Sequence, residues 1–470
     1  MKKHKILFIA AMIIIVGVVL LSCKAPEIIK KTVTETVTET VTETVEVEVE
    51  VEVPAEVEEV AEEEEPITLY FWDEAGQIHD EMQPMFDLYS AEHPNVTFSV
   101  STFDAGGLQD IVPSALSSGA EDLDFLFYYG HGEAQEFGEK GLLTDLTPYY
   151  GEYDWYNQQY PGASLELTAS NGKLYFISTD FVMYGINYYN KAIFDAAGVE
   201  APSELEDIFE ISAKIKDAGN DTWGIGNQWF WTVRQVAESL SLRFIPNDVH
   251  SILFDWKNLS SEEQRENLDL LKSEGVLEVF KFIERMAEEG VFIEGFNTLD
   301  DGGGRLAFTN ESAAIYSSGS WAIGLIMSEA PQIDFDYFIM PTYEGRTNFP
   351  ASYANSLTVP SYTAGKKLEV ILDFFNSMLQ PEYAKFSFDA ALISSSTNFS
   401  EAELAEFVDP ITAKLINDSS AKGGVVTIHS NWPTDMAVAW DTACQEVTAF
   451  TMTPEEAVQL FYDTAEEMLE

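Results

Sequence analysis

Basic residues are scarce in this chain. Its 470 residues include 25 Lys and Arg against 80 Asp and Glu, which gives a formal net charge of −55. Phosphate contacts require clustered cations, so this composition argues against nucleic acid as a partner. An anionic solute is disfavoured for the same reason, unless a local basic pocket overrides the overall charge. The acidity favours solubility and does not by itself establish a saline habitat.

Cysteine is nearly absent, with Cys23 and Cys444 as the two copies. Exported proteins often depend on disulfides, but Cys23 lies in a leader segment, so the folded part is expected to rely on its apolar cores. Cys444 falls in a stretch with helical character, residues 436–447. We expect it to be a small buried core residue.

Motifs for common hydrolytic and metal chemistry are also missing. The chain has no H-E-x-x-H and no G-x-S-x-G, and its six histidines are scattered. The run Gly302–Gly304 lacks the lysine of a phosphate loop and is interpreted as a flexible loop, while Gly130–Glu133 is too short to specify a metal site. No metal, cofactor or catalytic residue is predicted. A surface glycosidase with two carboxylates stays a remote alternative, because so acidic a chain offers many carboxylate pairs.

Only one long apolar run is present, Ile6–Leu21, and its 16 residues fall short of the ~20 that a bilayer core requires. Lysines precede it and Ser22 and Cys23 follow it, which is typical of a secretory signal. A membrane span and an ordinary signal with an incidental cysteine remain alternatives. The cysteine position resembles the lipobox of prokaryotic lipoproteins. That resemblance implies a signal peptide over 1–22, lipidation of Cys23 and a membrane-anchored protein outside the cytoplasm.

Residues 23–66 are expected to form a lipid anchor and a disordered acidic linker. Residues 32–43 repeat Thr-Val-Thr-Glu three times, residues 45–53 alternate Val with Glu, and Glu62–Glu65 is a block of acids. Like charges at this spacing repel one another, and the segment offers little apolar surface to offset chain entropy. An extended spacer is therefore predicted.

Residues 67–470 exceed the ~250–300 residues at which a single core usually divides, so two lobes are expected. Apolar patterning predicts strands at 67–72, 96–101 and 123–128, and helices at 81–92 and 108–116. This alternation indicates an α/β fold with helices on both faces of an open sheet. Ligands in such sheets bind beyond the carboxyl ends of the strands, which points to residues 72–74 and 128–133.

Four further helices are predicted beyond this region. Ser203 and Glu206 have the spacing of a capping box for a helix over 203–218. Amphipathic patterns predict helices at 277–289 and 368–379. The last helix is expected to start at Thr453, with Pro454 at its first position and Glu456 completing a second capping box.

Several motifs follow one another in a recognisable order. They are KGLLTDLTP at 140–148, NGKLY at 171–175, NYYNK at 187–191, FDAAG at 194–198, SAAIY at 312–316, GSW at 319–321, and MP at 340–341. Together they resemble the extracellular solute-binding proteins of ABC importers, family 1, which include maltose-type sugar binders. The resemblance covers essentially all of 67–470. It departs at Thr179–Asp180, where relatives usually carry a proline near the first hinge.

The resemblance implies a two-lobed, type II periplasmic-binding-protein-like fold in which each lobe is a mixed sheet flanked by helices. The chain would cross between lobes near 177–182, 350–356 and 400–410. An N-terminal lobe of 67–178 with 356–400 and a C-terminal lobe of 179–355 with 401–470 follow. Such a protein is not an enzyme. It would close around a small solute, expected to be a carbohydrate, and deliver it as a monomer to an ABC permease.

Sugars present apolar faces that aromatic rings stack on, and hydroxyls that carboxylates and amides bind. All nine tryptophans lie in 67–470. The predicted solute-binding residues, each with packing as the alternative role, are Trp72, Asp73, Glu74, Tyr129, Asp180, Trp229, Phe230, Trp231, Trp321, Tyr353, Asn355 and Trp432. Trp432 is expected to cap the cleft, whereas Trp155, Trp223, Trp256 and Trp440 are assigned to packing. An acidic, aromatic site would also suit a polyamine through carboxylate pairing and cation–π contact.

Overall fold

The computed structural model describes residues 65–469, and the account below concerns those residues. The predicted signal peptide over 1–22, Cys23 and nearly all of the 23–66 linker lie outside them. Within 65–469, no helix combines the length and the apolar character that crossing a membrane requires.

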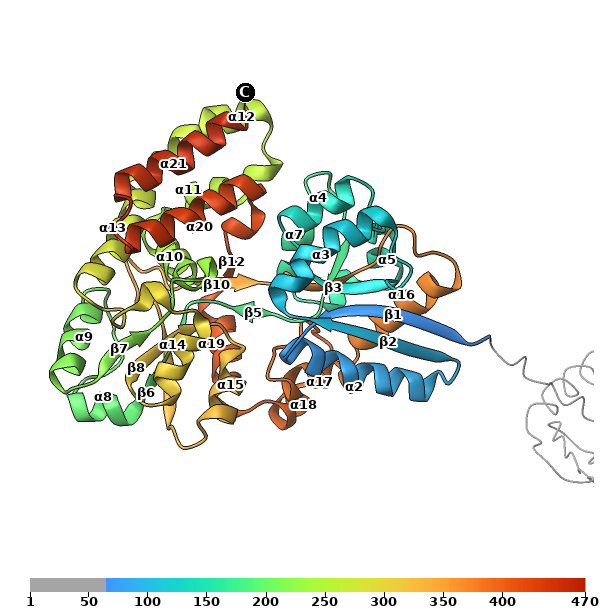
Figure 1. The fold of residues 1–470 in the computed structure, drawn as a ribbon, viewed down its shortest axis with the longest axis horizontal. Coiled ribbons are helices and arrows are strands. Elements are labelled where there is room, and N and C mark those ends of the chain that lie inside the picture. The colour runs from blue at the N-terminus through green and yellow to red at the C-terminus, as the bar shows by residue number, and fades with distance from the viewer. Residues whose placement is uncertain (1–64, 470) are drawn as a thin grey trace, which may run out of the picture. The chain divides into compact units, whose positions relative to one another are not determined.

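The first sheet has five strands in the order β2-β1-β3-β11-β4 (Figure 1). β1 pairs in parallel with both β2 and β3, and β11 lies antiparallel between β3 and β4. Its strands are β1 (Ile67–Glu74), β2 (Val96–Phe103), β3 (Phe125–Tyr129), β4 (Phe176–Ser178) and β11 (Asn355–Thr358). The three strands predicted at the start of the folded part are confirmed. β3 is buried on both faces, as its continuous apolar run predicted.

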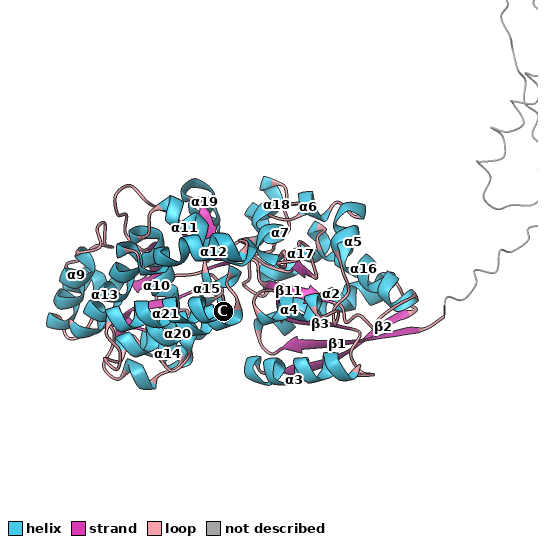
Figure 2. Cartoon of the chain, turned by 90° about the horizontal axis from the view of Figure 1, so that it is seen from above, coloured by secondary structure: helices cyan, strands magenta, loops and turns pink. Residues whose placement is uncertain are grey.

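Helices cover both faces of this sheet, with α3 on one side and α2 and α16 on the other (Figure 2). The rings of Phe86 and Phe374 pack at 5.3 Å and join the latter two helices over the sheet. The helices of this part are α2 (Gln77–Glu92), α3 (Ala105–Ser118), α4 (Glu133–Glu139), α5 (Thr147–Glu152), α6 (Trp155–Gln158), α7 (Pro161–Leu167), α16 (Lys366–Met378) and α17 (Pro381–Asp389).

The second sheet has four strands in the order β7-β8-β6-β9. β8 is parallel to β7 and antiparallel to β6, and β9 closes the other edge against β6. The strands are β6 (Ile186–Asn190), β7 (Asp221–Gly224), β8 (Ala313–Ser318) and β9 (Phe335–Ile339). Their helices are α8 (Lys191–Ala197), α9 (Asp207–Asp217), α10 (Phe230–Phe244), α11 (Asn247–Phe254), α12 (Ser261–Asn267), α13 (Glu274–Glu288), α14 (Asp301–Thr309), α15 (Ala322–Glu329), α20 (Thr434–Thr448) and α21 (Pro454–Glu467), with short 3-10 turns η1 (Trp256–Asn258), η2 (Leu268–Lys272), η3 (Phe296–Thr298) and η4 (His429–Asn431).

A small third sheet, in the order β12-β10-β5, lies where the chain passes between the two larger ones. β5 (Val182–Met183) falls between β4 of the first sheet and β6 of the second. β10 (Phe349–Ser352) falls between β9 of the second sheet and β11 of the first, and pairs with β12 (Gly424–Val426). Helices α18 (Glu401–Phe407) and α19 (Pro410–Lys422) precede β12. The number of hinges and the lobe boundaries stay predictions.

The apolar cores follow this division. One cluster of buried side chains lies in the first lobe, one in the second, and a smaller one around the linking sheet. Trp155, Trp223, Trp256 and Trp440 are at most 2% exposed, and Cys444 is fully buried, so their predicted packing roles are confirmed. The capping box of Thr453 and Glu456 is also present at the start of α21.

The predicted capping box at Ser203 and Glu206 is wrong. Helix α9 begins later, at Asp207. The Asp207 carboxylate accepts hydrogen bonds from the backbone N–H of Ser203 and Glu204, both at 2.9 Å. The Glu206 carboxylate instead pairs with Arg285 on α13, at 2.8 Å. The Glu206–Arg285 ion pair and the Asp207 carboxylate therefore replace the hydrogen bonds of the predicted capping box.

The interpretation of Gly302–Gly304 as a loop is also wrong, because these residues form part of α14. Asp300 caps that helix by accepting a hydrogen bond from the Gly303 N–H at 2.8 Å. A Cβ on Gly304 would lie 3.1 Å from backbone atoms of Gly224 in β7. The missing side chain lets helix and strand approach closely, which offsets the low helix propensity of glycine.

Candidate functional site

Three of the predicted residues meet at one edge of the first sheet. Glu74 ends β1, Tyr129 ends the parallel strand β3, and Asn355 begins the antiparallel strand β11 opposite Tyr129. The Tyr129 hydroxyl donates a hydrogen bond to Glu74 Oε2 at 2.7 Å. This is the edge at which α/β sheets bind ligands, and it presents a carboxylate, a phenol and an amide together.

Asp180 joins this group from the segment after β4. Its side chain is fully buried, and its Oδ2 accepts a hydrogen bond from Asn355 Nδ2 at 3.1 Å. Its Oδ1 has no hydrogen-bond partner among the described residues. Burial, with the charges of Glu81 and Glu74, raises the pKa of Asp180 well above its usual range. Burial also raises the pKa of Glu74, so both acids favour their neutral form more than a solvated carboxyl does.

The second lobe contributes a row of aromatic rings. Trp321, just before α15, packs edge-on against Trp231 at a centroid distance of 5.6 Å and against Tyr184 at 5.7 Å. Trp229 extends the row, 6.4 Å from Trp231. Trp229 is 49% exposed, while the other three rings are partly covered. Phe230 is the first residue of α10, and its side chain lies outside the described part of the chain.

Trp321 connects the row of rings to the first lobe. Its ring is packed against the apolar cluster of the first lobe and against the cluster around the linking sheet. Burial raises the pKa of Tyr129, and the charges of Glu74, Tyr184 and Asp180 act in the same direction. Gln77, at the start of α2, donates hydrogen bonds to the carbonyls of Trp321 and Ala390, at 3.2 and 2.9 Å. One ring of the row, that of Trp321, thus lies beside the first lobe.

The structure places three other predicted residues, Trp72, Asp73 and Tyr353, outside both of these groups. Trp72 is 8% exposed and packs on Phe103, and buried Asp73 accepts a hydrogen bond from His79 Nδ1 at 2.8 Å, so neither is hydrogen-bonded to the group of Glu74, Tyr129, Asp180 and Asn355. Tyr353 stacks on Phe181, with the ring centroids 4.8 Å apart, in the buried cluster around the linking sheet.

Trp432 requires a correction, because its ring is 1% exposed and does not cap an opening. It packs on Phe461 at 4.6 Å and on Trp440 at 5.5 Å, and its Nε1 donates to the Leu253 carbonyl at 2.7 Å. The ring belongs to the core of the second lobe.

Sequence reasoning missed Tyr184 and a group of charged residues behind the aromatic row. Arg234 on α10 pairs with Asp441 on α20 at 3.2 Å, and His429 Nδ1 lies 3.2 Å from Glu238 Oε1. The His131 ring of the first lobe lies 6.0 Å from that of His429. Burial and His429, with Arg234 and Lys257, lower the pKa of His131 to about 3. One clue was available: Arg234 and Glu238 follow Trp231 at helical spacings of three and seven.

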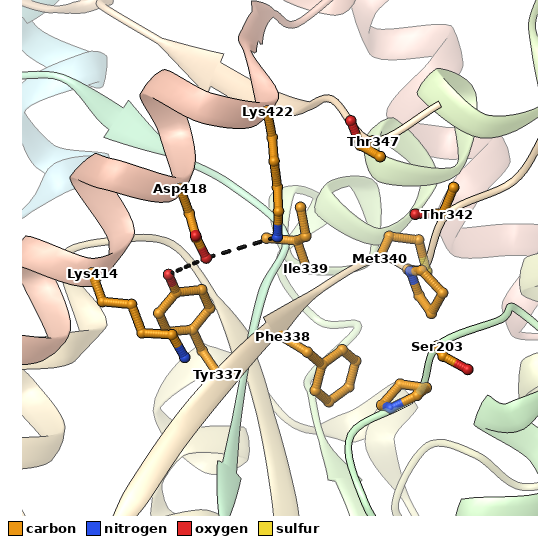
Figure 3. A pocket seen from close by; sticks show the side chains of 12 residues that line it. Ser203, Tyr337, Phe338, Ile339, Met340, Thr342, Thr347, Lys414, Asp418 and Lys422 are labelled. Carbon is orange, nitrogen blue, oxygen red and sulfur yellow. Dashed lines mark hydrogen bonds and ion pairs between the residues drawn. The ribbon is translucent and has the colours of Figure 1, made fainter. Parts of the chain in front are cut away.

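A cavity of ≈ 300 Å³ lies apart from these residues, between β9, α19 and Pro202–Ser203 (Figure 3). Asp418 accepts a hydrogen bond from the Tyr337 hydroxyl at 2.8 Å and lies 3.7 Å from Lys422 Nζ. Lys414 Nζ is within 2.5 Å of Asp336. None of the predicted solute-binding residues lines this cavity, and its cations have carboxylate partners.

Comparison with known families identifies the chain. A model of the family described as bacterial extracellular solute-binding protein matches residues 75–385. The chain belongs to this family. By the family's description, its members are extracellular proteins that bind solutes.

Curated relatives agree at low identity. An uncharacterised ABC transporter extracellular-binding protein of Pyrococcus horikoshii is 22% identical over 285 residues, which cover 59% of this chain and 61% of the relative. The multiple sugar-binding protein of Streptococcus mutans is 20% identical over 285 residues, covering 59% of this chain and 63% of the relative. The match thus spans less than two thirds of the length of either.

Solved structures show the same fold over most of the solute-binding protein. A chitin oligosaccharide binding protein aligns with a TM-score of 0.70 and 17% identity, covering 86% of this chain and 99% of that one. A bacterial solute receptor with a preference for β-D-galactopyranose aligns with a TM-score of 0.71 and 16% identity, covering 86% and 100%. The predicted α/β, type II fold is confirmed.

Proposed function

We propose that this protein captures a carbohydrate between its two lobes and delivers it, unaltered, to an ABC permease. The observation that carries the proposal is the packing of Trp321, which contacts Trp231 in the second lobe, against the first lobe, whose strand ends hold Glu74, Tyr129, Asp180 and Asn355. Aromatic faces bind the C–H surfaces of a sugar, and carboxyl and amide groups bind its hydroxyls. The second lobe offers the first kind of group and the first lobe offers the second.

The residues would have distinct roles. Trp231 and Trp321 stack on the sugar, with Trp229 beside Trp231. Asp180, Glu74 and Asn355 bind hydroxyls, and Tyr129 orients Glu74. Trp72, Asp73 and Tyr353 support these residues without touching the sugar, because they pack at the ends of β1 and β10.

The raised pKa of Asp180 favours a neutral solute over a polyamine. A carboxyl that retains its proton more readily can donate a hydrogen bond as well as accept one, which suits a hydroxyl. A bound cation would instead favour the ionised carboxylate. The names of the relatives support a sugar as well, since they include a multiple sugar-binding protein and a chitin oligosaccharide binding protein.

Contacts between the lobes supply the means of closure. Lys257 Nζ of the second lobe donates a hydrogen bond to Gln135 Oε1 of the first at 2.7 Å, and Gln77 reaches the Trp321 carbonyl. A solute that binds both lobes adds contacts that only the closed form makes, and so shifts the population toward it. The three hinge crossings and the lobe boundaries near 178 and 355 belong to this proposal.

Anchoring completes the proposed function. Lipidation of Cys23 would hold the protein at the membrane, and the acidic segment up to residue 66 would tether a monomeric receptor near its permease. Mass spectrometry of protein from the native membrane fraction would detect a lipid-modified mature N-terminus at Cys23. An unmodified Cys23 in the mature chain would contradict the anchor.

Titration calorimetry against a panel of neutral sugars and polyamines tests the solute class. The proposal expects binding of at least one sugar with an affinity that barely changes between low and high salt, because no net charge is paired. Binding of a polyamine alone, weakened steeply by salt, would replace the sugar with a cationic solute.

A further inference from the structure

The loop Gly130–Gly132, which follows β3, holds His131 in a fixed place at the edge of the first lobe. Gly130 leaves no room for a side chain, because a Cβ there would lie 2.7 Å from Ser356 Oγ. Its backbone N–H donates a hydrogen bond to the Ala354 carbonyl at 2.7 Å. The backbone that carries His131 is therefore positioned by the sheet edge itself.

The same loop contacts the second lobe at two points. Gln135 of α4 donates a hydrogen bond to the Gly130 carbonyl at 2.9 Å, and its Oε1 accepts one from Lys257 Nζ of the second lobe at 2.7 Å. The His131 ring lies 6.0 Å from the ring of His429 in η4. Closing the lobes thus brings the imidazole of the first lobe against the charged residues of the second.

The groups that face His131 disfavour a proton on its ring. Those acting on it directly are His429, Arg234 and Lys257. The nearby acids already have partners, since Glu238 Oε1 lies 3.2 Å from His429 Nδ1 and Asp441 pairs with Arg234 at 3.2 Å. The titratable groups that act on His131 or on the groups around it are Arg234 and Glu238 on α10, His250 on α11, Lys257 in η1 with Asp255 before it, His429 in η4, Asp441 and Cys444 on α20, Glu139 on α4, Glu166 on α7, and Tyr184.

We propose that His131 makes the protein acid-sensitive: a proton on its ring disfavours closure of the lobes, so the solute is released as the surroundings become acidic. Histidine suits this role because its charge changes near neutral pH. The inference rests on the proposed closure around a solute and adds a means of regulating it.

The sign of the effect follows from the surroundings of the ring in the two forms. Burial, followed by the charges of His429, Arg234 and Lys257, lowers the pKa of His131 from 6.5 to about 3. Separation of the lobes removes the charges of the second lobe, so this pKa returns toward 6.5. Between pH 6.5 and 3 the open form therefore binds a proton that the closed form does not. The contribution of His131 to closure is complete above pH 6.5 and is lost as the pH falls toward 3.

The test counts the protons released when the full chain binds a sugar. Calorimetric titrations at pH 5.5 in acetate and in Bis-Tris, which have different enthalpies of ionisation, give that number. The tightest binder among galactose, glucose, xylose, N-acetylglucosamine, maltose, raffinose and chitobiose is the probe. Burial raises the pKa of Asp180 and Glu74, and these acids take up protons on closure. The informative quantity is therefore the difference between wild type and His131→Gln.

Wild type is expected to release about 0.5 to 0.9 proton more than His131→Gln, because an imidazole of pKa 6.5 is about nine-tenths protonated at pH 5.5. The lower figure corresponds to screening of the neighbouring charges at the partly exposed ring. Between pH 7.5 and pH 5.5, wild-type affinity should fall about five- to tenfold more than that of the variant.

Two further variants separate this effect from general damage. His131→Asn is a second uncharged replacement and should behave as His131→Gln does, with thermal unfolding showing that both fold. His93→Gln removes an imidazole of the first lobe whose side chain is 41% exposed and which lies 4.0 Å from Asp373. It should match wild type in proton release and in the pH dependence of affinity.

Three results would overturn the inference. Equal proton release by wild type and both His131 variants, with sugar binding intact, would remove the acid sensitivity and leave the carbohydrate function standing. An equal loss of proton release in His93→Gln would show that His131 is not its source. Absence of binding by every sugar would defeat the proposed carbohydrate function, and this inference with it.

Discussion

At the scale of single residues, the proposed solute contacts combine aromatic rings with carboxyls whose pKa is raised by burial. Trp321 contacts Trp231 and Tyr184 with its ring, while its backbone carbonyl accepts a hydrogen bond from Gln77 of the other lobe. Because that inter-lobe hydrogen bond uses the backbone, replacing the side chain removes the stacking surface and keeps the bond.

Trp321→Ala is therefore expected to lower sugar affinity by about tenfold or more, with a loss of stacking worth about 1.5 kcal/mol. The thermal midpoint should fall by a few degrees at most, because the ring is partly exposed. Calorimetry and thermal unfolding measure the two effects, with Phe450→Ala as the matched aromatic control. An affinity equal to wild type would remove the proposed stacking role.

At the scale of elements, the linking sheet is held by a buried carboxylate. Glu166 in α7 is fully buried, and it accepts hydrogen bonds from the Ser352 hydroxyl at 2.6 Å and the Tyr353 N–H at 2.5 Å. Both donors lie at the end of β10, where the chain passes from one large sheet to the other. Burial raises the pKa of Glu166 to about 7.

This carboxyl predicts a pH dependence of stability. Between its ordinary value near 4.5 and about 7, the folded state binds more protons at Glu166 than the unfolded state does. Stability from this group is therefore present below pH 4.5 and declines as the pH rises through 7. Glu166→Gln keeps a neutral side chain of similar shape, so it should remove of the order of 1–3 kcal/mol of that decline.

Urea unfolding at pH 5 and pH 7.5 measures this difference. Relative to wild type, the variant should be more stable at the higher pH than at the lower one. Glu206→Gln alters an exposed carboxyl and serves as the control. Identical pH slopes in Glu166→Gln and wild type would contradict the account.

At the scale of the whole molecule, contacts between lobes set how readily the protein closes. Lys257→Met removes the ammonium that bonds Gln135 but leaves the aromatic row untouched. A closed form weakened in this way lowers the apparent affinity without altering any sugar contact. The expected loss is about two- to tenfold, measured by calorimetry.

Lys281→Met is the matched control, because Lys281 pairs with Glu278 on the surface of α13 at 3.3 Å. Stopped-flow measurements should show that Lys257→Met mainly speeds sugar release. Equal affinities in the Lys257 and Lys281 variants would show that this hydrogen bond does not contribute to closure.

The sequence predicted those features that depend on local periodicity. Strands β1 to β3 and helices α13, α16 and α21 follow from apolar spacing and capping residues. The short strands β5, β10 and β12 did not, because strands of two to four residues form only where the surrounding tertiary structure pairs them. Trp432 could not be assigned correctly either, since its neighbour Phe461 lies 29 positions away in the sequence.

The candidate site could be predicted only in part, because local patterns indicate some of its residues and not others. Glu74 and Tyr129 follow from the ends of parallel strands, which meet at one edge of a sheet. Tyr184, Arg234 and Asp441 meet only through the packing of α10, α20 and the linking sheet. No spacing along the chain encodes that meeting.

The most direct measurement is an experimental structure of the protein with a sugar that binds in titration. The account predicts the sugar between the lobes, with a ring on Trp321 and hydroxyls on Asp180 and Asn355. A sugar held instead in the cavity beside Tyr337 and Asp418, or bound to one lobe with the aromatic row empty, would contradict it.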